Sequence, residues 1–161
     1  MFVHGGVMHI VSNLVFLAVF APMVEDAMGR GKFLVFYLLG GLAATAAQIA
    51  MDPTSTVPQL GASGAIAGVM GAFLVTYPGD RIKLLWFFGV FAHVSQVPAF
   101  VLIGLWLISQ MLNQMGAVLE ADAGGIAYAA HVGGAFFGIL TARLFERDVE
   151  RGAAPRRAQS A

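Results

Sequence analysis

Five apolar segments, separated by short polar stretches, constrain the fold of this chain more than any other feature. They cover residues 7–24, 33–51, 63–77, 96–115 and 126–145. Most of them approach the roughly 20 residues that an α-helix needs to cross the hydrocarbon core of a bilayer. Of the 161 residues, 58% are hydrophobic and 11% are charged, whereas a typical soluble domain has about 25% charged residues. The sequence therefore predicts an all-α membrane protein, a polytopic bundle of about five transmembrane helices.

The third segment is the shortest of the five. Its glycines at positions 64, 68 and 71 fall on one face of a helix. Small residues on one face let helix backbones approach closely inside a membrane. We therefore expect a short central helix that begins at Ser63 and is buried among its neighbours rather than exposed to lipid.

The distribution of basic residues predicts the orientation in the membrane. With five crossings, every lysine and arginine falls on one side: Arg30, Lys32, Arg81, Lys83, Arg143, Arg147, Arg151, Arg156 and Arg157. This side should be cytoplasmic, because loops rich in Lys and Arg stay on the cytoplasmic side. The apolar segment 82–95 would spoil the pattern if it were a sixth span, so we expect it to be interfacial or re-entrant.

We expect one transmembrane domain over residues 1–145 and a charged cytoplasmic tail over residues 146–161. The tail mixes charged residues with Ala, Pro and Ser, which is typical of disorder. The formal net charge is +0, so no basic field favours a nucleic-acid partner. The absence of cysteine excludes disulfides, thiolate catalysis and thiolate metal sites. The sequence does not indicate an oligomeric state.

Four polar side chains lie at one depth within the apolar segments. His9 and Asn13 are one helical turn apart near the outer end of the first segment, and His131 lies near the outer end of the last. Ser63 begins the third segment from the same side. At about 1.5 Å of rise per residue, all four fall within roughly the outer third of the bilayer. Buried polar residues in a membrane face one another or water, and they are candidates for function.

These side chains can support nucleophilic catalysis. A serine hydroxyl needs a base to take its proton, and His131 is a suitable base from a different helix. Ser63 would lie at a helix N-terminus, where backbone N–H groups and the helix dipole can stabilise an oxyanion. His9 and Asn13 could add side-chain donors. The segments have no carboxylate at this depth, so the catalytic unit would be a Ser–His dyad, with no metal and no organic cofactor.

Three strings carry a family resemblance. They are HGGVMHIVSN (4–13), GASGAIAG (61–68) and AHVGGAFFG (130–138). In this order they resemble the three signature regions of the rhomboid intramembrane serine proteases, and the similarity extends over most of the chain. Compared with the six-helix bacterial form, the chain resembles a rhomboid that lacks the first transmembrane helix.

The resemblance implies a role for each polar residue. Ser63 would be the nucleophile and His131 its general base. His9, Asn13 and the backbone N–H of Ser63 would form the oxyanion hole. His4 matches the first histidine of the family, at the rim of the site. The substrates would be transmembrane segments of other membrane proteins, cleaved near the surface of a bacterial cytoplasmic membrane by a site that opens to the outer face.

The resemblance also gives the small residues a role. Gly61 would leave room for the substrate backbone beside the nucleophile. Gly64, together with Gly134 and Gly138 on the last helix, would allow close packing around the site. Ala67 stands where some members of the family carry an aromatic ring that packs on the catalytic histidine, so other residues must orient His131 here.

Each of these residues also has a simpler interpretation. Ser63 could be a helix cap, and the glycines could be ordinary packing residues. His131 and Asn13 could form hydrogen bonds between helices. We expect Phe100, Trp106 and Met111 to face lipid or the core, and His93 to be an interfacial residue.

Two other functions compete with proteolysis. A non-catalytic rhomboid-like protein would bind or deliver transmembrane clients, but such proteins typically lose the serine or the histidine. A small transporter could use His9, Asn13 and His131 as a polar path, but the inner halves of the segments offer no further ionisable residues for a relay.

Overall fold

The computed structural model describes residues 1–56, 58–88, 91–120 and 127–147. The elements, in chain order, are α1 (Val7–Met28), α2 (Arg30–Met51), α3 (Ser63–Thr76), β1 (Arg81–Phe88), β2 (Phe91–Pro98), α4 (Ala99–Glu120) and α5 (Tyr128–Phe145). The five helices correspond to the five apolar segments, so the predicted helical membrane bundle is confirmed. Helix α4 begins later than we expected, because strand β2 continues as far as Pro98.

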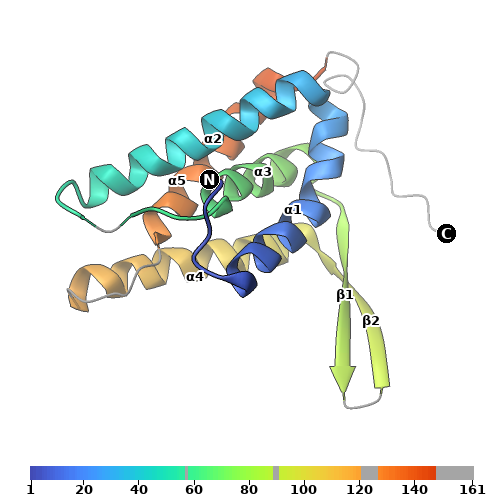
Figure 1. Ribbon diagram of the computed structural model, residues 1–161. Coiled ribbons are helices and arrows are strands. Elements are labelled where there is room, and N and C mark those ends of the chain that lie inside the picture. Colours follow the sequence, from blue (N-terminus) through green and yellow to red (C-terminus); the bar gives the residue numbers. More distant parts are fainter. Residues whose placement is uncertain (57, 89–90, 121–126, 148–161) are drawn as a thin grey trace.

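Helix α3 forms the centre of the bundle. It packs against all four other helices (Figure 1), and every residue from Gly64 to Phe73 is buried. This confirms the expectation of a short central helix. Helices α2 and α5 lie on one side of α3 and pack against each other, whereas α1 and α4 lie on its other side (Figure 1).

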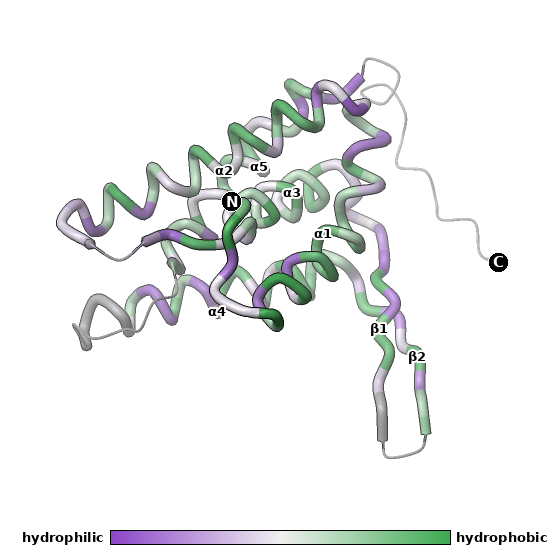
Figure 2. Tube along the Cα trace, viewed as in Figure 1, coloured by the Kyte–Doolittle hydropathy of each residue, from purple (hydrophilic) through white to green (hydrophobic). Residues whose placement is uncertain are grey.

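Three helices among the described residues are long and apolar enough to cross a membrane. They are α1, α2 and the part of α4 from Ala99 to Gly116. Apolar residues dominate the middle of these helices, and polar residues gather toward their ends (Figure 2). Helix α3 is shorter than a membrane span. It lies among its neighbours, which surround it with protein instead of lipid.

Glycines bring α5 close to α3. A Cβ added at Gly134 would collide with the carbonyl oxygen of Gly64, and one added at Gly138 would collide with that of Gly68. On α3 itself, a Cβ at Gly71 would collide with the carbonyl oxygen of Ala135. The two backbones therefore touch along several turns, which fixes the position of one helix relative to the other.

Segment 82–95 is not an additional helical span. It belongs to an antiparallel hairpin in which β1 pairs with β2 from Arg81↔Pro98 to Phe88↔Phe91. The expectation of an interfacial or re-entrant piece did not foresee strands, because a short apolar run cannot be assigned to helix or strand by periodicity alone. The hairpin projects from the end of the bundle at which α3 ends and α4 begins (Figure 1).

The basic residues within the described part of the chain gather at one end of the bundle. There, the Tyr77 hydroxyl after α3 donates a hydrogen bond to the carbonyl oxygen of Met23 in α1, at 3.0 Å. The Arg143 guanidinium of α5 donates to the carbonyl oxygen of Val75, at 2.5 Å. The C-terminal ends of α1, α3 and α5 therefore meet, together with the start of α2 and the hairpin.

The tail that we expected from residue 146 begins with two packed residues. Glu146 is fully buried, and its carboxylate accepts hydrogen bonds from Thr76 Oγ1 (2.8 Å) and Arg143 (2.9 Å). The backbone N–H of Arg147 donates to the carbonyl oxygen of Ala27 at 2.9 Å. Paired in this way, a carboxylate can be buried, so Glu146 and Arg147 pack against the bundle, while the division between domain and tail stays a prediction. Residues 148–161 lie outside the described part.

Candidate active site

Ser63 and His131 form a direct hydrogen bond between α3 and α5. The distance between Ser63 Oγ and His131 Nε2 is 2.7 Å. Ser63 is the first residue of α3, and its N-cap is Ala62, which makes no side-chain cap hydrogen bond. The Ser63 hydroxyl therefore contacts His131 rather than capping its own helix. His131 is in the first turn of α5, at the same end of the bundle.

The loop before Ser63 is held in place by the N-terminal segment. The backbone N–H of Gly61 donates to the carbonyl oxygen of Val3 at 2.8 Å. Gly61 has φ +104°, a left-handed conformation that favours glycine. A Cβ at Gly61 would lie 2.6 Å from His9 Nε2. His9 therefore excludes any side chain at Gly61, while Gly61 also lines a cavity beside Ser63; the room it would leave for a substrate backbone stays a prediction.

His9 and Asn13 approach the serine from α1. The Asn13 side chain is buried, and its Nδ2 donates to the carbonyl oxygen of His9 at 2.7 Å. The backbone N–H of Gly5 donates to His9 Nδ1 at 3.4 Å. The amide group of Asn13 has two hydrogens, so one of them stays available for a ligand.

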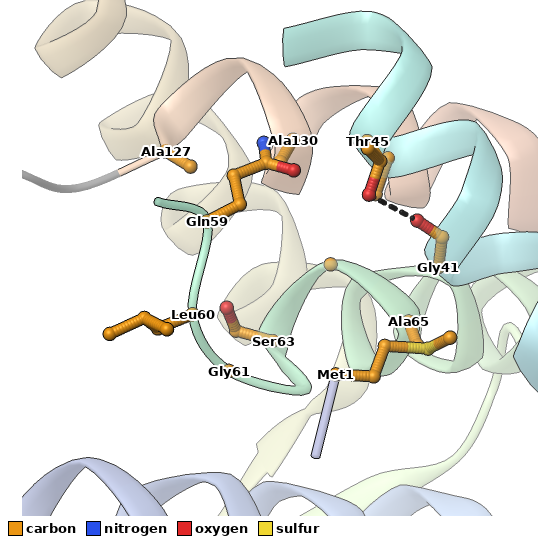
Figure 3. A pocket seen from close by; sticks show the side chains of 12 residues that line it. Met1, Gly41, Thr45, Gln59, Leu60, Gly61, Ser63, Ala65, Ala127 and Ala130 are labelled. Carbon is orange, nitrogen blue, oxygen red and sulfur yellow. Dashed lines mark hydrogen bonds between the residues drawn. The ribbon is translucent and has the colours of Figure 1, made fainter. Parts of the chain in front are cut away.

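A cavity of about 100 Å³ lies between α1, α3 and α4. Its lining residues are Ser12, Asn13, Phe16, Ser63, Ile66, Met70 and Trp106. Asn13 and Ser63 therefore line the same cavity, and the other lining residues are mostly apolar. A second cavity, of about 50 Å³, lies on the other side of Ser63, between α2, α5 and the loop from Gln59 to Gly61 (Figure 3).

His4 lies beside His9. The two rings meet edge to face, with their centroids 5.2 Å apart. Within the described residues, His4 Nε2 is buried and has no hydrogen-bond partner. His4 thus packs on His9, one of the predicted oxyanion donors.

The other nitrogen of His131 contacts a residue that the sequence analysis missed. His131 Nδ1 lies 2.7 Å from Gln110 Oε1, on α4. The ring of Trp106, one turn earlier on α4, lies 5.7 Å from the imidazole, with the two planes inclined at 37°. We expected Trp106 to face lipid or the core, and it does pack against the buried core, but its contact with the His131 ring was not foreseen.

Comparison with known proteins identifies the family. The Rhomboid domain profile matches residues 1–147. The chain belongs to the rhomboid family.

Curated relatives of this rhomboid are found in fungi and animals. The chain is 29% identical to Rhomboid protein 1, mitochondrial, of Saccharomyces cerevisiae, over 93% of its own length and 41% of that protein. It is 29% identical to Presenilin-associated rhomboid-like protein A, mitochondrial, of Danio rerio, over 86% of its own length and 34% of the relative. It therefore spans less than half of the length of these relatives. No solved structure matches the chain significantly.

A signal for Gln110 was present in the sequence. Gln110 is a polar residue inside the apolar segment 96–115, and the argument that selected Asn13 applies to it equally. Gln110 lies about as far from the outer end of segment 96–115 as His131 lies from the outer end of segment 126–145, so its depth matches that of the predicted set. The direction in which α4 presents it is decided only by how α4 packs against α5.

The site has the groups that acyl transfer needs. Among the described residues, no cluster of three or more His, Asp or Glu side chains could hold a metal ion. The hydroxyl of Ser63 has a histidine nitrogen within reach, and unpaired N–H groups of the first turn of α3 point out of the helix beside it. This arrangement suits a serine nucleophile with a neighbouring oxyanion hole.

Proposed function

We propose that this rhomboid is an intramembrane serine endopeptidase that cleaves transmembrane segments of other membrane proteins. The observation that carries the proposal is the 2.7 Å hydrogen bond between Ser63 Oγ and His131 Nε2, at the N-terminus of the buried helix α3. Membership of the rhomboid family, which includes serine proteases, supports it.

The proposed reaction proceeds in two halves. Ser63 Oγ attacks the carbonyl carbon of a peptide bond, its proton passes to His131 Nε2, and the electron pair of the C=O bond moves to the oxygen. When the tetrahedral intermediate collapses, the C–N bond breaks and His131 gives the proton to the leaving amine. A water molecule then attacks the acyl-enzyme, with His131 as the base, and releases the new carboxyl end and free Ser63.

The developing oxyanion needs donors on the side of Ser63 that is away from His131. The backbone N–H of Ser63 is the first of these, because it lies at the positive end of the α3 dipole. Asn13 is the second, since it lines the same cavity as Ser63 and has a free amide hydrogen. His9 would be the third, from its place against Gly61.

The substrate and the orientation follow from the membrane setting. A transmembrane helix would have to unwind locally to present a peptide carbonyl to Ser63, and small residues suit the confined space. By the positive-inside rule, the basic end of the bundle faces the cytoplasm and the Ser63 end faces outward. The expected bacterial cytoplasmic membrane stays a prediction, since the names of several relatives assign them to mitochondria.

Labelling with a fluorophosphonate probe tests this function. In the reaction a bond forms between Ser63 Oγ and phosphorus, and fluoride leaves, so the labelled residue reports an activated serine. We expect the membrane-embedded chain to be labelled, and Ser63→Ala and His131→Ala to abolish labelling. Ser55→Ala, a change in the loop after α2, is the matched control and should be labelled normally.

Cleavage of a reporter transmembrane helix in proteoliposomes is the second measurement. A chain that is labelled at Ser63 and cuts the reporter fulfils the proposal. If Ser63→Ala still cuts the reporter, the assignment of the nucleophile is wrong. If the folded chain is neither labelled nor cuts, the non-catalytic alternative, in which the same fold binds transmembrane clients, replaces the protease.

A further inference from the structure

Among the described residues, His131 has no carboxylate partner, and Ala67 offers no aromatic ring from α3 to support the imidazole. A histidine that acts as a base must nevertheless present one particular nitrogen to the serine, in the right tautomer. Helix α4 contacts the ring in two ways: through the Gln110 side chain on Nδ1 and through the Trp106 ring near its face.

The hydrogen bonds around Gln110 determine which way its amide points. The Ser109 hydroxyl donates to the carbonyl oxygen of Trp106 at 2.6 Å. Having used its only hydrogen, Ser109 Oγ can act only as an acceptor toward Gln110, whose Nε2 lies 3.1 Å away. The NH₂ group of Gln110 therefore faces Ser109, and its Oε1 faces His131.

The orientation of Gln110 in turn determines the tautomer of His131. Oε1 can only accept a hydrogen bond, so His131 Nδ1 must carry a hydrogen and donate it. Nε2 is then unprotonated in the neutral ring and accepts the hydrogen of the Ser63 hydroxyl, 2.7 Å away. This is the tautomer that general-base catalysis by His131 requires.

We propose that Gln110 is a positioning residue that completes a Ser63–His131–Gln110 chain, with Trp106 supporting the imidazole. The inference rests on the proposed function and adds the residue that orients the general base of that reaction. Gln110 is buried, so water does not compete for His131 Nδ1. As a neutral acceptor it selects the tautomer and orients the ring, and it stabilises the imidazolium less than a carboxylate would.

Two substitutions at Gln110 separate this role from simple packing. Gln110→Met keeps the length and burial of the side chain but removes the acceptor. Gln110→Glu keeps an acceptor and adds a charge beside the ring. Gln114→Met, one turn later on α4, is the matched control. Among the described residues, the charge of His9 on α1 also acts on His131.

The first measurement is the ¹⁵N NMR spectrum of histidine in the full chain, held in lipid nanodiscs. We expect His131 to be protonated at Nδ1 in the unmodified chain and in Gln114→Met, and to become a mixture of tautomers in Gln110→Met. This measurement needs no catalysis, so it separates failure of the inference from failure of the proposed function. A His131 that keeps one tautomer in Gln110→Met overturns the inference.

The second measurement is the rate of fluorophosphonate labelling between pH 5 and 9. Loss of a hydrogen bond to a group that becomes charged should make Gln110→Met slower by about tenfold to a hundredfold. Gln110→Glu should restore most of the rate and move the acid limb of the profile to higher pH, because a carboxylate favours the imidazolium. An unchanged acid limb in Gln110→Glu, or equal slowing in Gln114→Met, contradicts the proposal.

A separate observation concerns the β1–β2 hairpin. Large apolar side chains are exposed toward its tip: Leu85 (55%), Trp86 (46%), Phe91 (75%) and Val94 (57%). They lie on both faces of the ribbon, since neighbouring residues of a strand point to opposite faces. Arg81 and Lys83, closer to the bundle, are exposed as well. A two-stranded ribbon with this surface is not stable in water alone.

We infer that the hairpin lies in the headgroup region of the leaflet at the basic end of the bundle and binds anionic lipid. Helix α4, which follows the hairpin in the chain, also exposes large apolar side chains, among them Phe100 and Leu105. The open strand edges of the hairpin keep it out of the hydrocarbon core, where unpaired backbone groups are too costly. Arg81 and Lys83 match the negative headgroups.

Spin labels measure the depth of the hairpin directly, because the chain has no cysteine of its own. Leu85→Cys and Val94→Cys, labelled with a nitroxide in nanodiscs of phosphatidylglycerol and phosphatidylcholine, should be more accessible to oxygen than to a water-soluble nickel complex. Gly79→Cys, in the open turn before β1, is the control and should show the reverse.

Two results would overturn the hairpin inference. Labels at positions 85 and 94 that behave like the one at position 79 would place the tip in water. Labels shielded from both reagents would mean that a protein surface covers the tip.

With Arg81→Gln and Lys83→Gln combined, the labels should become more accessible to the nickel complex. An unchanged accessibility would contradict the role of the two cations.

Discussion

The two sides of helix α3 are built differently. Toward α2 and α5, α3 presents glycines: Gly71 touches the α5 backbone so closely that a Cβ has no room, and a Cβ at Gly68 would lie only 3.3 Å from the carbonyl oxygen of Gly134. Toward α1 and α4, it presents Ile66 and Met70, and a cavity of about 100 Å³ remains. On the first side, the backbone of α3 packs against the backbone of α5. On the second side, side chains pack against side chains and leave a cavity.

This difference assigns separate tasks to the two sides. The glycine side sets the distance between Ser63 and His131, because α3 and α5 cannot slide apart or twist without losing their close contact. The cavity side contacts the His131 ring through Trp106 and Gln110, and in the proposed reaction its cavity, lined by Asn13, would receive the substrate carbonyl. Substitutions on the first side should affect the fold, and those on the second side should affect the chemistry alone.

The largest effect is expected from Gly138→Val. The added side chain would collide with the carbonyl oxygen of Gly68, so α5 must move away from α3 and the Ser63–His131 bond must break. We expect a strongly lowered Tm in detergent and no labelling of Ser63. Gly104→Val, on α4, is the matched control, because a Cβ there meets no atom within 4 Å. If Gly138→Val keeps the Tm of that control, the two sides of α3 do not differ as described.

A smaller effect, without loss of the fold, is expected from Asn13→Ala. Removal of one oxyanion donor typically lowers kcat by about 10²–10³-fold. The measurement is turnover of the reporter transmembrane helix, with the Tm recorded beside it. Ser12→Ala, at the neighbouring position in the cavity wall, is the control, since its hydroxyl bonds to the backbone of His9. Equal loss of turnover in both variants would speak against a donor role for Asn13.

The smallest effect is expected from Trp106→Leu. An aromatic contact contributes about 0.5–1.5 kcal/mol beyond its buried area, so we expect Ser63 labelling to slow by about two- to tenfold. Phe100→Leu, an exposed aromatic on the same helix, should leave the rate unchanged. A labelling rate for Trp106→Leu equal to that of Phe100→Leu would mean that the ring does not support His131.

The sequence by itself determined the membrane class, the five helices and the buried position of α3. Long apolar runs form helices when they cross a bilayer. The glycines of α3 predict close packing against its neighbours. It also selected Ser63, His131, His9 and Asn13, because polar residues at one depth in a membrane have few other partners.

Only the tertiary structure decided the rest of the site. Helix α4 is apolar around most of its circumference, so its sequence does not show which face meets α5, and Trp106 and Gln110 were not selected. The hairpin was equally ambiguous, since its short apolar runs fit more than one conformation. The burial of Glu146 depends on partners from α3 and α5 that converge only in the folded bundle. Local pattern determines which elements form, whereas the direction of each side chain is set by the packing of elements that are distant in the sequence.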